Sequence, residues 1–310
     1  MEKTHKAKKS LGQNFLKSEP ALKKIIEAGE INKDDIILEI GPGKGALTKK
    51  LLEVAGCVIA VEKDRELFAF LQEKFSEEIS IGKLILINED ILEIEIADKS
   101  FSDSPQKFSA ENFLCPAPSR LPRVHSRTIY LPSNYKIIAN IPYNITGAIL
   151  KKFLTEKNQP SLMVLMVQHE VAKRIVARDG KQSILSISVK AYGNPKIEMK
   201  VPARYFSPAP KVDSAIISIK NISREFFTES TSPQPSPLKG EGVASTAQIK
   251  NSSSLEFEEK FWEIIHAGFA HKRKKLSSNL KKHIGPSSIE LKNKRAEELS
   301  LTDWINILKY

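Results

Sequence analysis

One short run of this sequence has the chemistry to hold an aromatic amine: residues 140–143 read Asn-Ile-Pro-Tyr. The exocyclic nitrogen of adenine is a poor nucleophile, because its lone pair is delocalised into the ring. Asn140 Oδ1 and the carbonyl oxygen of Ile141 or Pro142 could accept both amine hydrogens and shift that nitrogen toward a tetrahedral geometry. Tyr143 offers a face on which a base stacks once it has left its helix. We therefore predict a clamp for adenine N6, although Asn and Pro also favour ordinary turns.

A cofactor site is predicted upstream of this run. Gly41 and Gly43, which follow an apolar run at 36–40, allow the backbone to approach a ligand closely. Glu62 follows the next apolar run, where a carboxylate can accept hydrogen bonds from both ribose hydroxyls of an adenosine. NAD and S-adenosylmethionine share that adenosine, so these residues alone leave both cofactors open.

Asp90 helps to separate the two cofactors. It follows a third apolar run, at 84–87, and is placed to accept a hydrogen bond from the amine of a cofactor adenine. An aspartate at the end of a strand is also a common turn cap. Together with the glycine turn and Glu62, Asp90 favours S-adenosylmethionine, whose sulfonium methyl would be attacked in line. Neither a metal nor an acid–base residue is needed before transfer, because the N6 proton can leave afterwards.

These residues must be brought together by the elements that carry them. Five short apolar runs lack the polar alternation of half-exposed strands and are typical of strands buried on both faces: 36–40, 57–61, 84–87, 136–140 and 162–167. Helical patterns lie between them, as at 45–53 and 65–75. This alternation predicts a doubly wound α/β domain with a mainly parallel sheet, in which the strand ends meet at one edge.

Two proline- and serine-rich segments, 99–134 and 228–254, interrupt this alternation. Neither has enough apolar side chains to offset the cost of ordering the chain, so we predict a disordered insert and a linker. Apolar residues return at helical spacing near the C-terminus. The predicted organisation is a catalytic domain over 1–221 that contains the insert, a low-complexity linker over 222–254, and a small all-α domain over 255–310.

The chain is basic, with a formal net charge of +11. Four lysines lie within 3–9, and six cations lie within 271–282 without an intervening acid. Clustered cations bind phosphate backbones by releasing counterions, so a nucleic acid is an expected partner, although a solvated basic face has the same composition. No apolar run approaches the roughly 20 residues that span a membrane.

The compartment is predicted from weaker signals. Cys57 and Cys115 suggest neither a disulfide framework nor a zinc site. The first ten residues carry lysines without a following apolar stretch, so they do not resemble a secretory signal. These features favour a reducing, cytoplasmic compartment and no bound metal.

In this order, the motifs resemble the KsgA-type ribosomal RNA adenine dimethyltransferases, a family that also includes the Erm methylases. The matching blocks are Lys-Ser-Leu-Gly-Gln-Asn-Phe-Leu at 9–16, the glycine turn, Glu62, Asp90, Asn-Ile-Pro-Tyr-Asn at 140–144, Gln-His-Glu-Val-Ala-Lys-Arg-Ile at 168–175 and Phe-Ser-Pro-Ala-Pro-Lys-Val-Asp-Ser at 206–214. They cover about 10–98, 135–221 and 257–310. The two predicted inserts depart from the family pattern but remove no motif residue.

The resemblance implies a Rossmann-like class I methyltransferase domain with a mainly parallel seven-stranded sheet. It implies that Asn14 and Leu16 touch the donor, and that Phe206 faces Tyr143 across the target adenine. The implied donor-binding set is Asn14, Leu16, Gly41, Gly43, Glu62, Asp90 and Asn140, and the implied catalytic set is Asn140, Pro142, Tyr143 and Phe206.

A basic block at 268–280 resembles the motif with which the KsgA branch grips the small ribosomal subunit, whereas the Erm branch acts on large-subunit RNA. The resemblance therefore implies dimethylation of two adjacent adenosines in the 3′-terminal hairpin of small-subunit ribosomal RNA. The implied partner is an immature small subunit, and the implied state of the enzyme is monomeric.

Two other functions share parts of this pattern. A non-catalytic ribosome-assembly or RNA-binding factor could use the same fold. Such a factor need not keep Glu62, Asp90 and Asn140, which are all present. A DNA adenine methylase would use the same donor with a related Asn-Pro-Pro-Tyr clamp. Ile141 in place of the first proline, and the loop at Phe206, favour RNA over DNA.

Overall fold

The computed structural model describes residues 7–98, 127–177, 180–229, 246–283 and 293–308. The expectations for residues 99–126 and 230–245 lie outside the described residues. The chain divides into two compact units. Unit 1 comprises residues 1–172 and 194–222, and unit 2 comprises residues 173–193 and 223–310.

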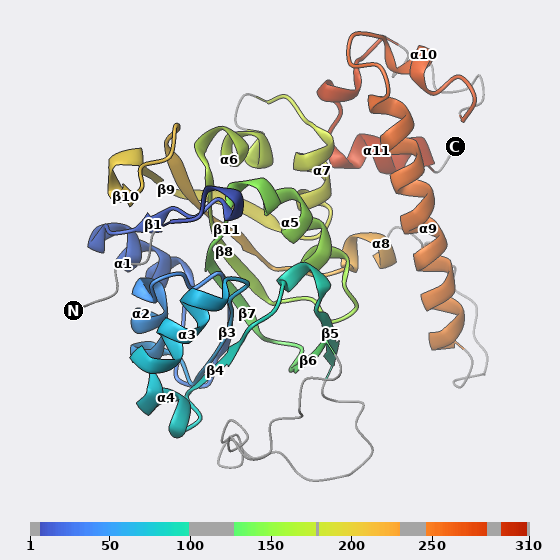
Figure 1. Ribbon diagram of the computed structural model, residues 1–310. Coiled ribbons are helices and arrows are strands. Elements are labelled where there is room, and N and C mark those ends of the chain that lie inside the picture. The colour runs from blue at the N-terminus through green and yellow to red at the C-terminus, as the bar shows by residue number, and fades with distance from the viewer. Residues whose placement is uncertain (1–6, 99–126, 178–179, 230–245, 284–292, 309–310) are drawn as a thin grey trace. The chain divides into compact units, whose positions relative to one another are not determined.

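Unit 1 is built on a seven-stranded sheet in the order β4-β3-β2-β7-β8-β11-β9 (Figure 1). Five strands run parallel: β2 (Ile36–Ile40), β3 (Cys57–Val61), β4 (Leu84–Ile87), β7 (Lys136–Asn140) and β8 (Leu162–Gln168). The strand β11 (Ser214–Lys220) pairs antiparallel with both β8 and β9 (Asn194–Val201). The predicted mainly parallel, seven-stranded sheet is confirmed, and each of the five predicted strands matches to within one residue.

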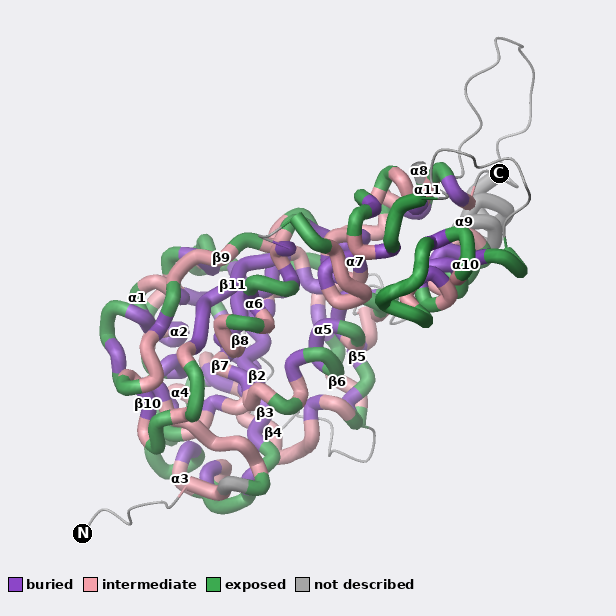
Figure 2. The backbone as a smooth tube through the Cα atoms, turned by 90° about the horizontal axis from the view of Figure 1, so that it is seen from above, coloured by how far each residue is buried: buried purple, intermediate pink, exposed green. Residues whose placement is uncertain are grey.

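Helices alternate with these strands in unit 1: α1 (Glu19–Ala28), α2 (Ala46–Val54), α3 (Arg65–Lys74), α4 (Ser76–Ser80), α5 (Thr146–Thr155) and the start of α6 (His169–Val176). Every residue of β2 and β3 is buried, as expected for strands covered on both faces. Figure 2 shows buried chain along the strands of the sheet. This core fixes the positions at which β2, β3 and β7 end, and the predicted site residues follow those ends.

Two pairs of short strands complete unit 1. The strand β1 (Phe15–Leu16) pairs antiparallel with β10 (Phe206–Ser207), and β5 (Glu95–Asp98) pairs parallel with β6 (Thr128–Leu131). The strand β6 lies inside the segment predicted to be a disordered insert, so that prediction was too long at its C-terminal end. The error has a physical reason: the Thr-Ile-Tyr-Leu run favours a strand, and Leu131 is fully buried.

Unit 2 is helical, with α7 (Ile184–Lys190), α8 (Glu225–Glu229), α9 (Thr246–Phe269), α10 (Leu276–Asn279) and α11 (Leu301–Leu308). The helix α8 and the first residues of α9 lie within the predicted 222–254 linker. Between Gly242 and Gly268 the sequence has no glycine or proline that would oppose the extension of a helix. Unit 2 also includes 173–193, which the sequence assigned to the catalytic domain.

An aromatic cluster explains why 173–193 joins unit 2. The Tyr192 ring lies 5.3 Å from that of Phe227 and 6.2 Å from that of Trp262, between ring centroids. The Tyr192 hydroxyl donates a hydrogen bond to Glu258, and Arg224 pairs with the same carboxylate at 2.7 Å. These partners are distant in sequence, so local pattern could not reveal the boundary.

The two remaining sequence expectations concern cysteines and membranes. Cys57 is buried in β3, and the expectation that the two cysteines form no disulfide stays a prediction. Cys115 lies outside the described residues. Among the helices of the described ranges, none is both long and apolar enough to cross a bilayer.

Candidate active site

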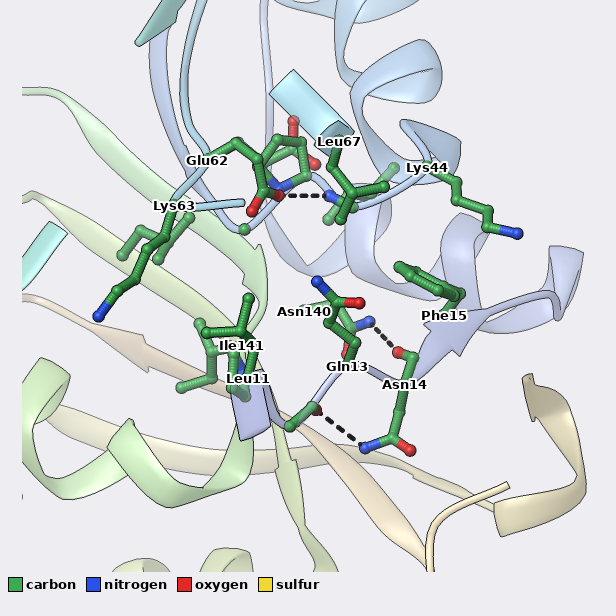
Figure 3. Close-up of a pocket in the computed structure, with 18 of the residues that line it drawn as sticks. Leu11, Gln13, Asn14, Phe15, Lys44, Glu62, Lys63, Leu67, Asn140 and Ile141 are labelled. Carbon is green, nitrogen blue, oxygen red and sulfur yellow. Dashed lines mark hydrogen bonds between the residues drawn. The ribbon is translucent and has the colours of Figure 1, made fainter. Parts of the chain in front are cut away.

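A cavity of about 600 Å³ lies at the carboxyl edge of the parallel strands in unit 1 (Figure 3). Residues that follow β2, β3, β4 and β7 line it, together with the N-terminal segment 10–17. The predicted residues that line the cavity are Asn14, Leu16, Gly41, Gly43, Glu62, Asp90, Asn140, Pro142 and Tyr143. The structure therefore brings together every predicted site residue except Phe206.

The glycine turn and Glu62 form one wall. Gly41 and Gly43 have φ angles of 66° and 61°, a region that glycine adopts without strain. A Cβ atom at residue 43 would lie 3.1 Å from the Phe15 ring. Gly43 N–H donates to Glu62 Oε2 at 3.1 Å, and Asp64 N–H donates to Oε1 at 2.8 Å. These two bonds fix the orientation of the carboxylate, and its remaining lone pairs can accept from ribose hydroxyls.

Two opposing effects act on the pKa of the Glu62 carboxyl group. The residue is 5 % exposed, and burial raises the pKa of its carboxyl group. The hydrogen bonds from the backbone N–H groups of Asp64 and Gly43 oppose that rise, because they stabilise the charged form. A buried carboxylate with two fixed donors is a rigid acceptor.

Asp90 is both a cap and a member of the cavity wall. Its Oδ1 accepts from Leu92 N–H at 3.0 Å, at the start of a 3-10 turn, and its Oδ2 accepts from Lys63 Nζ at 2.6 Å. Burial would raise the pKa of Asp90, but these hydrogen bonds outweigh it and hold the pKa below its ordinary value. The carboxylate is therefore ionised and available as an acceptor on the cavity wall.

Asn140 ends β7 with its amide turned by a defined contact. Its Nδ2 donates to the carbonyl oxygen of Asn14 at 3.1 Å, as Figure 3 shows. This bond uses the donor end of the amide, which leaves Oδ1 as the acceptor for an incoming amine. Pro142 follows with φ −59° and caps a 3-10 turn over Tyr143–Ile145. The clamp is thus positioned by two features: the contact from Asn14 in the N-terminal segment and the turn that follows β7.

Segment 8–16 lies along the cavity and is held there by polar contacts. Lys8 Nζ and Gln13 Nε2 donate to the two carboxylate oxygens of Asp64, each at 2.8 Å. The Asp64 side chain is fully buried. The Asn14 carbonyl also accepts a hydrogen bond from Asn140, and β1 pairs with β10. The segment is therefore held by contacts to Asp64, to Asn140 and to β10. The sequence predicted contacts for Asn14 and Leu16 but missed the role of Lys8 and Asp64.

Phe206 lies away from the cavity. It is 4 % exposed and packs in the hydrophobic core, paired with Leu16 between β10 and β1, while its neighbour Ser207 reaches the cavity. The resemblance implied that Phe206 faces Tyr143 across the target adenine. In this structure Phe206 instead packs in the core. Its burial could not be read from the sequence, because an aromatic before Ser-Pro-Ala-Pro fits a packing role as well as a stacking role.

Glu39 is a cavity residue that the sequence prediction missed. It is the next-to-last residue of β2, is 1 % exposed and lines the cavity, and its Oε2 has no hydrogen-bond partner among the described residues. Burial raises the pKa of its carboxyl group to about 8, and the nearby charge of Glu62 adds to the rise. The available signal was a single acidic residue inside the apolar run 36–40.

Glu39 gives the protein a testable pH dependence of stability. Because its pKa rises from an unfolded value near 4.5 to about 8, the folded state binds the extra proton between these values. Stability should therefore fall as pH rises from about 5 to 8. Glu39→Gln lacks this group, so its stability should exceed that of the wild type by a few kcal/mol at pH 8.5, since one pKa unit corresponds to about 1.4 kcal/mol. Urea unfolding from pH 5 to 9 would measure this, and parallel pH curves would contradict it.

The predicted basic cluster lies in unit 2, where it can be described on its own. Its members follow the end of α9 or flank α10, and all of them are exposed: Lys272, Arg273, Lys274, Lys275, Lys281 and Lys282. In the structure this cluster lies on a turn after α9 and around the short helix α10. Within the described residues, no group of three His, Cys, Asp or Glu side chains could hold a metal ion.

Comparison with known families decides what this site belongs to. A family model described as "Ribosomal RNA adenine dimethylase" matches residues 4–232, which carry the whole cavity. The chain belongs to the ribosomal RNA adenine dimethylase family. This membership confirms the resemblance inferred from the motifs, and the matched residues include the cavity, the Asn-Ile-Pro-Tyr turn and the Phe206 loop.

Relatives of known name agree with this membership. The chain is 37% identical to "Ribosomal RNA small subunit methyltransferase A" of Dehalococcoides mccartyi, over 97% of this chain and 87% of that protein. It is 33% identical to the protein of the same name from Fusobacterium nucleatum, over 98% of this chain and 97% of that protein. Both relatives therefore match this chain over nearly its full length.

Solved structures support the fold. The 23S rRNA methyltransferase ErmE has a TM-score of 0.63 at 21% identity and covers 96% of this chain and 98% of its own. A dimethyladenosine transferase from Plasmodium falciparum has a TM-score of 0.64 at 24% identity, with coverage of 95% and 96%. At these identities, the similarity establishes the class I methyltransferase fold and does not separate the branches of the family.

Proposed function

We propose that this protein transfers methyl groups from S-adenosylmethionine to N6 of two adjacent adenosines in the 3′-terminal hairpin of small-subunit ribosomal RNA. One observation carries the proposal: the side chain of Asn140 lies on the wall of the cavity with its amide nitrogen bonded to the Asn14 carbonyl. That bond leaves an oxygen acceptor beside a space lined by the carboxyl groups of Glu62 and Asp90.

The cavity fits the proposed donor. The fixed carboxylate of Glu62 matches two ribose hydroxyls, and the ionised Asp90 matches an adenine amine. The unpartnered Oε2 of Glu39 lies on the cavity wall and can accept a hydrogen bond from the ammonium group that the donor carries. When bound, S-adenosylmethionine would supply an electrophilic methyl group whose transfer removes the positive charge on sulfur.

The chain's own residues would prepare the nucleophile. Asn140 Oδ1 and a carbonyl oxygen at 141 or 142 accept the two N6 hydrogens, and the amine lone pair is then directed at the methyl carbon. Pro142 offers no N–H that would compete for those acceptors. Tyr143 provides a stacking face for the extruded base. The N6 proton leaves to solvent after transfer, and one of the two acceptors can then hold the single remaining N6 hydrogen for a second round.

Two observations support the small subunit as substrate, and the cytoplasm as location follows from that substrate. The matching relatives bear the name of a small-subunit methyltransferase. Unit 2 presents six exposed cations without an intervening acid, which suits a folded RNA with closely spaced phosphates. Immature ribosomal subunits are assembled in the bacterial cytoplasm, where we propose that the protein acts as a monomer without a metal.

A methylation assay with defined ribosomal substrates tests this function. Immature small subunits from an undermethylated strain, incubated with the protein and labelled S-adenosylmethionine, should yield N6-dimethyladenosine at two adjacent positions of the 3′-terminal hairpin. Raising the salt concentration should slow the reaction steeply, because phosphate contacts release counterions. Mapping the modified nucleotides by mass spectrometry provides the measurement.

Two parallel substrates make this assay decisive. Large subunits and duplex DNA, presented at the same concentration, should receive no label. Incorporation into large-subunit RNA would move the protein to the other branch of its family. Binding to small subunits without incorporation into any substrate would identify a non-catalytic assembly factor.

A further inference from the structure

The Tyr143 hydroxyl has a partner that the proposed mechanism does not use. It shares a hydrogen bond with Oγ of Ser214, the first residue of β11. Tyr143 lines the cavity at the end of β7, whereas Ser214 is fully buried. Because β11 runs antiparallel to β8, its first residue lies at the same sheet edge as the last residues of β7 and β8.

The backbone around Ser214 is held on two sides. Ser214 pairs with Gln168 of β8 and with Val201 of β9. The preceding residue, Asp213, accepts a hydrogen bond from Ala203 N–H at 3.0 Å through its carboxylate and one from His169 N–H at 3.0 Å through its carbonyl. The backbone that carries the Ser214 hydroxyl is therefore fixed in the sheet.

Tyr143 is held less firmly by its own backbone. It begins a three-residue 3-10 turn, and its carbonyl oxygen accepts from Thr146 Oγ1 at 3.0 Å. A ring on such a turn can rotate about its two side-chain torsions. A stacking face binds a base best when the position of the ring is fixed before the base arrives, since otherwise binding must order it. The hydroxyl oxygen lies on the Cβ–Cγ axis, so only rotation about the first torsion moves it, and it then moves further than any other atom of the side chain. A hydrogen bond at this oxygen therefore holds the ring in place.

We propose that Ser214 is a positioning residue, which holds the Tyr143 ring in place through its hydroxyl so that the extruded adenine stacks in register with the Asn140 clamp. This inference rests on the proposed function, because it assumes that Tyr143 receives the base. Ser214 itself touches neither the base nor the donor. Its whole effect passes through one hydrogen bond to Tyr143.

A double-mutant cycle tests this route of action. Ser214→Ala and Tyr143→Phe each remove one partner of the same hydrogen bond, and each should lower the single-turnover rate of methyl transfer about three- to tenfold, the range expected for one net hydrogen bond. The double variant should be no slower than the slower single variant. Affinity for S-adenosylmethionine, measured by calorimetry, should stay within about twofold of the wild type in all three.

Ser218→Ala provides the matched control. Ser218 is also fully buried on β11, four residues along on the same face, but its hydroxyl donates to Glu198 at 2.7 Å instead of to a cavity residue. Its loss should lower the melting temperature about as much as Ser214→Ala while leaving the transfer rate unchanged. A merely structural role for Ser214 predicts that both serine variants lose rate in proportion to their loss of stability.

The remaining outcomes separate this inference from the function beneath it. An active wild type whose Ser214→Ala variant keeps its full rate would contradict the positioning role alone. Multiplicative losses in the double variant would also contradict it, because Ser214 would then act by another route. A wild type that methylates no adenosine in any substrate would overturn the proposed function and, with it, the role given to Tyr143.

Discussion

Asn140→Ala should slow methyl transfer about 100- to 1,000-fold, the cost of losing one preorganised group that acts on the reacting atoms. The alanine cannot accept an N6 hydrogen, so the amine lone pair stays in the ring. The substitution also frees the Asn14 carbonyl from its 3.1 Å bond to Asn140. Single-turnover measurements at saturating S-adenosylmethionine would isolate the chemical step, while filter binding to small subunits should remain near the wild-type value.

Asn194→Ala serves as the control for this prediction. Asn194 is an exposed asparagine at the start of β9, where it pairs with Lys220 at the opposite edge of the same sheet from the clamp. Its replacement should leave both the rate and the binding unchanged. A transfer rate for Asn140→Ala within tenfold of the wild type would show that the backbone carbonyls alone activate the amine.

Glu62→Ala should weaken the binding of S-adenosylmethionine by about 100-fold, as expected for the loss of two hydrogen bonds to a charged group. The same change leaves the N–H groups of Gly43 and Asp64 without their carboxylate acceptor, and the glycine turn loses a support. Glu62→Gln keeps one acceptor oxygen, so its affinity should lie between that of the alanine variant and that of the wild type. Titration calorimetry would measure all three.

Glu73→Ala is the matched control, because Glu73 is an exposed glutamate on the neighbouring helix α3. Its affinity for the donor should equal that of the wild type. Donor affinity of Glu62→Ala within threefold of the wild type would remove Glu62 from the ribose site. It would also indicate that this carboxylate serves only to hold the glycine turn.

The sheet and most of the cavity were predictable because burial and position leave clear marks in the sequence. Parallel strands covered on both faces require apolar side chains at nearly every position, so β2 and β3 appear as apolar runs. Polar residues that follow such runs meet at one edge of the sheet. This rule is sufficient to predict that Glu62, Asp90 and Asn140 line one cavity, as they do.

Other features depend on contacts that a local pattern cannot record. The edge strand β9 mixes exposed and half-buried residues, so it carries no clear alternation. Whether Phe206 faces the cavity or the core depends on its pairing with Leu16, far away in the sequence. Glu39 stands out within an apolar run, but only the structure places it on the wall of the cavity.

The division of the chain limits how the helical unit can be exchanged between family members. The polypeptide passes from one unit to the other after Ala172, after Gly193 and after Ile222. A truncation at Ile222 would strip Tyr192 of Phe227, Trp262 and Glu258, and would leave a buried aromatic residue in water. Unit 2 is therefore not a detachable tail. A functional graft of another substrate-binding unit must carry its own version of 173–193 as well as the C-terminal helices.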